Sequence, residues 1–469
     1  MKSKQSKRIR NIIAVFMASV LVFVAFFGSN QQVKAEEKEE DLVSKYYGPV
    51  DGIELPELRD ECGKHYLLPD GSMQYVGNPD RIHYLDEQGV YQDIDNHIID
   101  ETSWIEGTHF TKRNRANDLI IRFAEESEGT NDLIRIEYKN SAISFRPESV
   151  VCNRVNFENY DLRDLIDFVN PDYCVVYITD QGYDLVYQVT ENGLKEYIIV
   201  RSAATGNRFS FEYSFENLDL EQDESGSSVL YFTDVNGEKQ FATSRLYAFD
   251  QSGALTEQVY FDIAQTGVND RIDVLIDNEW ISNPDRSFPL VIDPTTMITG
   301  EYVTYDTFTC SLYPNNNYYL SDYLRIGIDD DFGTRYSFIK FDLPSIASSS
   351  VTSAYINLRM SACDGTPYMY ARRCVTSWSS DTLKWNNMPT PSYDSGDTSN
   401  VAVYDYNHDD TNWYTMKDTT LVKKWLAGTA NNYGVWLFNA PENASVWATY
   451  YSSDYGYPNR PELVINYTS

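Results

Sequence analysis

The chain has 469 residues and a formal net charge of −32 at pH 7, from 70 acidic and 38 basic side chains. A surface this acidic repels polyanions, so the composition excludes nucleic acid and anionic membrane surfaces as preferred partners. The length exceeds what one hydrophobic core usually serves, so we expect at least two domains.

The N-terminal segment has the three parts of a secretory signal peptide. Basic residues crowd residues 1–10, an apolar run covers residues 12–27, and Val33-Lys34-Ala35 offers small residues to a signal peptidase. We expect a signal peptide at residues 1–35 and an acidic linker at residues 36–60. The alternative is an uncleaved anchor, but about sixteen apolar residues fall short of the roughly 20 that a spanning helix needs. The mature protein is expected to be secreted, extracellular or cell-wall associated, without a stable membrane anchor.

Residues 61–295 are predicted to form a β-rich domain. The clearest pair of strands is 184–189 and 194–200, because Asn192-Gly193 between two alternating runs is a strong hairpin signal. One helix is predicted at Asn159–Phe168, where apolar residues recur at helical spacing. The other predicted strands are residues 82–86, 90–96, 118–123, 133–138, 208–215, 228–232, 245–249 and 259–263.

A domain boundary is predicted after Phe288–Thr295, a short apolar strand that contains two prolines. The acidity falls at this point, since residues 36–295 carry a net charge of −31 and residues 296–469 a net charge of −7. We place the linker at Asp293–Met297 and the second domain at residues 298–469.

The second domain is predicted to be a jelly-roll-like β-sandwich with one short helix, which makes the whole protein all-β. Ser337–Leu343 alternates polar and apolar residues and stops at Pro344, as a strand with one buried face does. Thr419–Leu426 reads as an amphipathic helix closed by Gly428.

Ordered sequence pieces in this domain resemble the DNRLRE family of bacterial extracellular domains, which is grouped with carbohydrate-binding module family 96. The first domain is similar to the β-rich region that precedes such modules in wall-associated proteins of the rearrangement-hotspot type. The resemblance implies a sandwich that binds carbohydrate. The matching pieces are Asp306–Phe308, Pro314–Tyr318, Leu324–Gly327, Arg335–Leu343, Trp378, Thr382–Pro389, Val422–Trp425, Asn432–Val435, Tyr451–Tyr455 and Arg460–Leu463.

Sugar rings stack on aromatic planes, and their hydroxyls need polar partners. Trp413 and Tyr414 follow a polar loop and are candidates for such a platform, whereas Trp425 and Trp436 are expected to pack in the core. An anionic polysaccharide would need cations, because guanidinium groups grip carboxylates in bidentate fashion. The alternative for these cations is ion pairing with Asp322, Asp342 and other acids. The candidate cations are Arg325, Arg335, Lys340 and Arg359, with Arg372 and Arg373 nearby.

Asp329-Asp330-Asp331 is dense in the oxygen ligands that calcium prefers, but it lacks the spacing of an EF-hand. A polar hairpin turn is the alternative for these residues. Among the six cysteines, Cys363 with Cys374 and Cys152 with Cys174 are candidate disulfides, and small buried side chains are the competing interpretation. No zinc-type cysteine spacing occurs, so calcium is the one cofactor considered.

The sequence contains no nucleophile elbow, zinc-protease motif or phosphate loop. We therefore expect a secreted, non-catalytic protein that binds extracellular or cell-wall polysaccharide and no nucleic acid. The alternative is a structural cell-surface or adhesion protein without glycan recognition. A glycan-active enzyme is a third interpretation, because the two carboxylates that such an enzyme needs can come together in space without a sequence motif.

Overall fold

The computed structural model describes residues 52–468, except for 128–130, 157–159, 161–170, 223–228, 245, 253, 257, 266–269, 299–304, 320, 322, 331, 366, 381, 403–412, 441–444 and 456–458. The expected signal peptide, most of the acidic linker and all but Tyr160 of the expected helix lie outside the described residues. Within the described part of the chain, no helix is long and apolar enough to cross a membrane.

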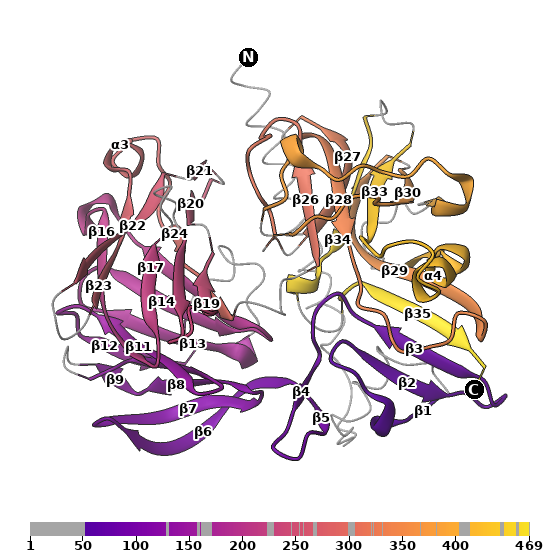
Figure 1. The fold of residues 1–469 in the computed structure, drawn as a ribbon. Helices are drawn as coiled ribbons and strands as arrows, with labels where there is room; N and C mark the ends of the chain where they lie inside the picture. Colours follow the sequence, from indigo (N-terminus) through magenta and orange to yellow (C-terminus); the bar gives the residue numbers. More distant parts are fainter. Residues whose placement is uncertain are drawn as a thin grey trace, which may run out of the picture. The chain divides into compact units, whose positions relative to one another are not determined.

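Two antiparallel sheets form the N-terminal region (Figure 1). The eight-stranded sheet has the order β22 (Val259–Gln265), β23 (Asp270–Ile276), β16 (Arg208–Glu216), β11 (Ser141–Pro147), β10 (Ile134–Tyr138), β8 (Leu119–Ala124), β7 (Thr108–Ala116) and β6 (Asp95–Ile105). The twelve-stranded sheet has the order β17 (Asp219–Gln222), β18 (Leu230–Thr233), β19 (Lys239–Thr243), β25 (Thr296–Ile298), β15 (Gly193–Val200), β14 (Tyr183–Val189), β13 (Cys174–Thr179), β12 (Cys152–Val155) and β9 (Glu126–Ser127), joined at β15 by β24 (Leu290–Asp293), β20 (Tyr247–Asp250) and β21 (Leu255–Thr256). A separate hairpin consists of β4 (His83–Leu85) and β5 (Tyr91–Asp93), and the short helix α3 covers Asn278–Ile281.

The apolar faces of these two sheets pack on each other. Phe145 of β11 meets Tyr187 of β14 with ring centroids 6.1 Å apart, and both belong to one large buried cluster. The other face of the eight-stranded sheet is charged, since Arg135 pairs with Glu137 at 2.6 Å and with Glu216 at 2.8 Å. Alternation along each strand thus puts one face in the core and pairs opposite charges on the other.

The C-terminal sandwich is built from one continuous chain of thirteen paired strands. Their order is β1 (Ile53–Glu54), β2 (Gly63–Leu67), β3 (Met73–Gly77), β35 (Glu462–Tyr467), β29 (Val351–Asp364), β34 (Trp447–Tyr451), β27 (Tyr323–Asp329), β28 (Gly333–Ile339), β33 (Val435–Asn439), β30 (Tyr368–Arg373) and β31 (Thr398–Ala402), with β26 (Asp306–Cys310) beside β28 and β32 (Trp413–Lys417) beside β29. The helix α4 covers Thr419–Leu426, and the 3-10 helices are Pro56–Leu58, Pro171–Tyr173, Ala203–Thr205, Trp385–Asn387, Ser395–Asp397 and Ser453–Tyr455.

The long strand β29 connects the two layers of this sandwich. Its first half pairs with β35 and β32, and its second half pairs with β34. The register shifts between Met360 and Ala362, where the strand changes partners. Strands that switch layers commonly turn the corner at such a bulge. The helix α4 covers one side of the core with Leu421, Val422 and Trp425.

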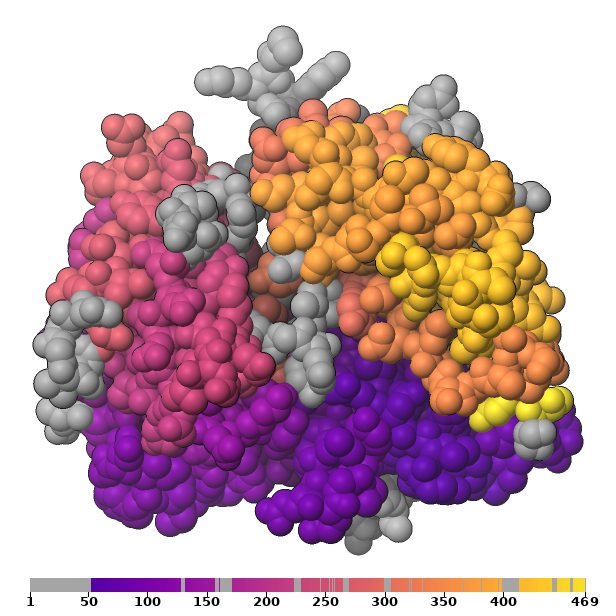
Figure 2. Space-filling model, in the orientation of Figure 1, coloured from indigo at the N-terminus to yellow at the C-terminus, as the bar shows by residue number. Residues whose placement is uncertain are grey.

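The first described strands belong to the C-terminal sandwich. Strand β3 pairs with β35 from Met73 opposite Tyr467 to Gly77 opposite Leu463, and Figure 1 shows the indigo strand beside the yellow one. In the space-filling view the indigo surface adjoins the yellow surface of the C-terminal strand (Figure 2). Tyr75 of β3 is fully buried in the core of the sandwich. The expected first domain begins at residue 61, whereas this pairing assigns strands β1 to β3 to the other domain.

The residues expected to link the domains are strand residues. Asp293 ends β24, and Thr296 and Met297 lie in β25, where they face Leu194 and Gly193 of β15. Ile298 completes β25 and is buried in the core of the N-terminal sheets. A Cβ atom on Gly193 would lie 2.4 Å from the Thr296 carbonyl oxygen, so the glycine allows this close pairing.

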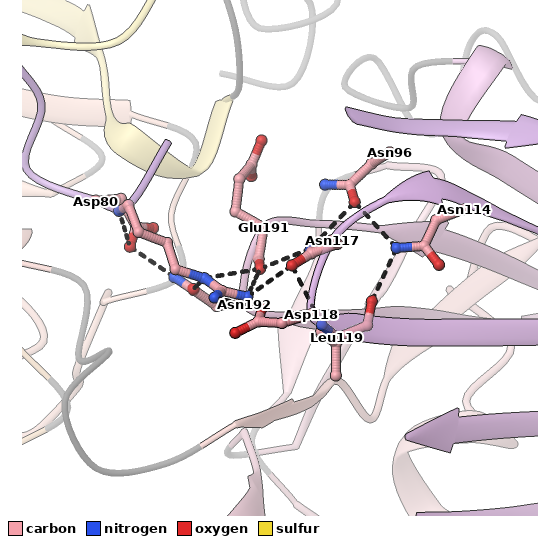
Figure 3. Close-up of polar contacts among 9 residues, drawn as sticks. Asp80, Asn96, Asn114, Asn117, Asp118, Leu119, Glu191 and Asn192 are labelled. Carbon is pink, nitrogen blue, oxygen red and sulfur yellow. Dashed lines mark hydrogen bonds and ion pairs between the residues drawn. The ribbon is translucent and has the colours of Figure 1, made fainter. Parts of the chain in front are cut away.

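A buried arginine holds the segment after β3 to two turns of the N-terminal sheets. Arg81 is 1% exposed and donates to the Glu191 carbonyl at 2.6 Å and to Asn192 Oδ1 at 2.8 Å. It also donates to Asn117 Oδ1 at 3.0 Å and pairs with Asp118 at 2.7 Å, and Figure 3 shows these acceptors converging. A buried charge is tolerated only with such full pairing.

The predicted all-β class is confirmed, and so are several local elements. Helix α4 has the predicted bounds, and the Asn192-Gly193 turn joins β14 to β15. The predicted pair at 82–86 and 90–96 appears as β4 and β5, except that Asp95 and Asn96 belong to β6.

Tyr75 tests the pairing between the two ends of the described chain. Its ring fills the space above Gly63 and Gly77, where added Cβ atoms would lie 2.3 and 2.5 Å from the ring. Tyr75→Ala is expected to lower the free energy of unfolding of the C-terminal sandwich by about 3–5 kcal/mol, because it leaves a core cavity. Urea unfolding of the full chain measures this. Ile53→Ala, at a side chain that is 68% exposed on β1, is the control. Equal stability of the two variants would refute the packing role of β3.

Candidate functional site

Strands β30 and β33 carry a row of aromatic side chains on their outer side. Along β30, Met369 and Ala371 are buried in the core, so the alternate residues Tyr368, Tyr370 and Arg372 face away from it. These three side chains are partly exposed. Aromatic residues on the outer positions of a strand are unusual, because those positions are normally polar.

The rings of this row contact one another. Tyr368 and Tyr370 have centroids 5.2 Å apart, and Tyr370 stacks on Phe438 of β33 at 5.4 Å. The Arg372 guanidinium lies 4.5 Å from the Phe438 ring and 5.0 Å from the Tyr393 ring. Tyr393 is 77% exposed. We name these five residues the aromatic face.

Arg372 is held by rings instead of acids. Among the described residues, its side chain has no ion pair and no hydrogen bond, only the two ring contacts. The next residue differs, since Arg373 pairs with Asp397 at 2.9 Å, and Asp397 also binds Lys424. Cation–π contacts hold a guanidinium in place while its N–H donors remain free to bind a ligand.

A second aromatic cluster continues from the aromatic face along β33 and β28. Trp436 lies directly opposite Arg372 and packs against Tyr336 with centroids 4.8 Å apart. Trp385 stacks on Tyr336 at 5.2 Å with planes 6° apart. In contrast, Trp378 donates its indole N–H to the Tyr433 carbonyl at 2.6 Å, so it serves packing.

The predicted cations Arg325 and Arg335 lie in an aromatic cluster of their own. Arg335 is 1% exposed, pairs with Asp329 at 2.8 Å and lies 5.5 Å from the Trp447 ring. Arg325 lies 4.8 Å from the Phe332 ring, and burial lowers the pKa of its guanidinium. These two arginines therefore hold the β27–β28 hairpin against its aromatic neighbours.

Lys340 is separate from both arginines. Its ammonium lies 4.2 Å above the Tyr305 ring, and its backbone N–H donates to the Tyr305 carbonyl at 2.7 Å. The four predicted cations thus do not form a single basic strip. Of the acids proposed as their partners, Asp322 is outside the described residues.

Two other predicted residues are brought together on the opposite layer. Arg359 of β29 lies directly opposite Trp413 of β32, and both are partly exposed. The Arg359 side chain also donates to Asn459 Oδ1. Tyr414, the next residue along β32, points the other way and is 8% exposed in the core. Trp413 therefore remains a candidate platform and Tyr414 does not.

Asp329 ends β27, and Asp330 lies in the turn that leads to β28. Asp329 accepts the Phe332 N–H at 2.8 Å and pairs with Arg335, so its carboxylate is already engaged. Gly333, opposite Asp329, has a φ of 71°. Among the described residues, no group of three or more His, Cys, Asp or Glu could hold a metal ion. Asp331 lies outside the described residues. Calcium binding therefore stays a prediction.

The expected disulfides are absent, since none of the six cysteines forms a disulfide bond. Cys152 lies opposite Thr179, five residues along β13 from Cys174. That separation is roughly 16 Å at ~3.3 Å per residue, far beyond the ~7 Å limit for a bridge. Cys363 packs at the sandwich core and Cys374 in a different cluster with Phe338. The competing interpretation as small buried side chains fits five of the cysteines, whereas Cys363 is partly exposed.

The aromatic face was not predicted from the sequence. The signal is the run Tyr368-Met369-Tyr370-Ala371-Arg372, in which aromatic and cationic residues alternate with small or apolar ones. A tyrosine in a predicted strand is interpreted first as a core residue. Only the burial of Met369 and Ala371 shows that the two tyrosines lie on the other side.

Comparison with known proteins assigns the C-terminal domain. Residues 299–467 match carbohydrate-binding module family 96. The C-terminal domain is a carbohydrate-binding-module-like domain. The matched range ends at Tyr467, the last residue of β35, and does not include β1 to β3, which complete the sandwich from the other end of the described chain.

The whole chain is similar to one part of longer proteins. It is 23% identical to the tRNA nuclease WapA of Bacillus subtilis strain 168, over 100% of this chain and 21% of that protein. It is also 23% identical to the tRNA(Glu)-specific nuclease WapA of Bacillus subtilis subsp. natto, over 97% of this chain and 20% of that protein. The chain thus spans about a fifth of the length of these relatives.

Among solved structures, the N-terminal domain of the Streptococcus gordonii adhesin Sgo0707 covers 80% of this chain and 86% of its own chain. The TM-score is 0.14 and the identity 7%, too low to indicate a common fold.

Alanine variants of Arg335 and Arg372 compare a buried arginine that stabilises the fold with a partly exposed arginine on the surface. Arg335→Ala removes a buried charge that pairs with Asp329, so we expect the free energy of unfolding to fall by about 3 kcal/mol. Arg372→Ala removes a partly exposed side chain and is expected to cost less than about 1 kcal/mol. Urea unfolding measures both. An equally stable Arg335→Ala variant would show that the buried pair does not hold the hairpin.

Glu462 of β35 should make stability depend on pH. Burial raises its pKa to about 7, opposed by the hydrogen bond that it accepts from Asn357 at 3.2 Å. A raised carboxyl pKa favours folding below pH ~4.5, and this contribution is lost as the pH rises to ~7. Glu462→Gln should therefore gain stability over the wild type between these values, on the order of 3 kcal/mol. Urea unfolding at both ends of the range measures the gain. If the free energies of unfolding of the two proteins changed in parallel with pH, this result would contradict the raised pKa of Glu462.

Proposed function

We propose that this protein is a secreted, non-catalytic protein that binds an extracellular or cell-wall polysaccharide through the aromatic face of its C-terminal domain. The match of this domain to a carbohydrate-binding module family supports the ligand class. The location is supported by the contacting rings of Tyr368, Tyr370 and the buried Phe438, which Arg372 connects to the exposed Tyr393.

The chemistry of the aromatic face suits a sugar chain. The C–H faces of pyranose rings pack on aromatic planes, and successive rings of a polymer can use successive tyrosines. Tyr368 and Tyr370 are two residues apart on one strand, which is a spacing of about 7 Å. Arg372, held between Phe438 and Tyr393, offers N–H donors to hydroxyl or carboxylate oxygens. Because no acid pairs with Arg372 among the described residues, this position favours a polysaccharide that carries carboxylates.

The absence of catalysis is part of the proposal. Glycoside hydrolysis needs two carboxyls about 5–9.5 Å apart at the sugar, one with a raised pKa. Among the described carboxyls whose pKa is raised most, Glu196, raised to about 8 by burial, accepts the Tyr187 hydroxyl in the N-terminal core, and Asp306, raised to about 7, is buried and accepts the Ser453 backbone N–H at 2.8 Å. Glu462 lies on β35. The nuclease activity named for the relatives belongs to proteins about five times as long, and a net charge of −32 opposes tRNA binding.

Variants of the aromatic face test the proposal. Tyr370→Ala and Arg372→Ala in the full chain should each weaken binding to alginate or to purified Gram-positive cell walls by about tenfold, equivalent to ~1.4 kcal/mol. Tyr370→Phe keeps the ring and should retain most of the affinity. Isothermal titration with soluble alginate and sedimentation with cell walls measure these effects.

The matched control is Tyr260→Ala, at a tyrosine of β22 that is 48% exposed. It should bind like the wild type. Unchanged binding by Tyr370→Ala would show that the ligand does not bind at the aromatic face. A wild-type protein that binds neither material would overturn the proposed function for these polysaccharides.

A further inference from the structure

The hairpin of β6 and β7 presents a tryptophan to solvent. Trp104 is 71% exposed and lies directly opposite His109. The connecting residues Glu106 and Gly107 have φ values of 48° and 87°. Two left-handed residues in a two-residue turn match the twist of a hairpin, so the tip is a regular structure.

The indole of Trp104 is held flat by the histidine. The two ring centroids are 4.8 Å apart and the planes differ by 11°. His109 therefore covers one face of the indole, while the 71% exposure of Trp104 leaves much of its surface open to solvent. Phe110, the neighbour of His109, is 1% exposed in the core. A slip of one residue in the register would expose Phe110, so the core packing fixes the outward direction of His109 and its partner.

The surroundings of the hairpin fit a single sugar ring better than a protein partner. Two residues further along β7, Thr111 accepts a hydrogen bond from Arg154 at 2.8 Å, and Arg154 also pairs with Glu125. Lys112 pairs with Asp100 at 2.5 Å. A stable protein interface needs about 800 Å² per partner with an apolar centre. One aromatic plane beside charged and hydroxyl groups instead matches the amphipathic face of a pyranose.

We propose that Trp104, stacked on His109, is a second carbohydrate-binding position, located on the N-terminal region and separate from the aromatic face. Its ligand is a pyranose ring of a polysaccharide, and the assumption that the protein meets such a polymer rests on the proposed function. Two positions on one chain raise the apparent affinity for a polymer, because the second contact becomes intramolecular.

The test uses the full chain and cell-wall sedimentation. Trp104→Ala should weaken binding about fivefold, as expected for the loss of one stacking contact. Trp104→Phe keeps a ring and should recover part of the loss. The double variant with Tyr370→Ala should bind more weakly than either single variant. Tyr260→Ala is again the control.

A second readout is fluorescence, since soluble oligosaccharides released from the wall should change the emission of the wild type more than that of Trp104→Phe. Wild-type binding by Trp104→Ala, together with a loss for Tyr370→Ala, would overturn this inference and leave the proposed function intact. A loss for Trp104→Ala with normal binding by Tyr370→Ala would support Trp104 and overturn the location given to the aromatic face. Failure of the wild type to bind would overturn both.

Discussion

The pairing of β3 with β35 is the constraint on which the C-terminal sandwich depends. Strand β35 lies between β3 and β29, so without β3 one edge of the last strand would lose its backbone partners. Unpaired backbone groups at a sheet edge invite pairing with other chains. Strand β3 also brings the buried Tyr75, whose ring needs the two glycines opposite each other at Gly63 and Gly77. The family match covers residues 299–467, yet the folded layer extends beyond it to residue 53.

Arginine has opposite roles at different places in this molecule, and the surroundings decide which. Arg81 and Arg335 are each 1% exposed and have carboxylate partners at 2.7 and 2.8 Å. Their charges are compensated by carboxylates inside the fold, and removing one partner of such a pair leaves the other buried and unpaired. Arg372 rests on Phe438 and Tyr393 instead. A ring does not neutralise a guanidinium, and within the part of the chain that the structure describes no acid engages the Arg372 donors. A candidate binding cation is therefore identified by its position relative to the core more than by its residue type.

Local patterns predicted local structure well, and long-range pairing is where they failed. The Asn192-Gly193 turn and the helix at Thr419–Leu426 are set by neighbouring residues, and both were found as expected. The partner of β3 lies almost four hundred residues away, and no local periodicity encodes it. The site residues show the same limit. Alternation puts Arg325 and Arg335 at plausible outward positions, but it cannot reveal that Phe332 covers both. Arg359 and Trp413 did meet, through a register that only the fold supplies.

The acidity of the chain limits how an anionic polysaccharide could be recognised. A net charge of −32 repels such a polymer at long range, and salt at 0.15 M screens this repulsion beyond about 8 Å. Electrostatic steering therefore cannot supply the affinity, in contrast to basic proteins that attract polyanions. Short-range contacts must dominate: ring stacking does not depend on net charge, and Arg372 acts only within hydrogen-bond distance. The aromatic face combines these two properties on the less acidic part of the chain, where residues 296–469 carry a net charge of −7.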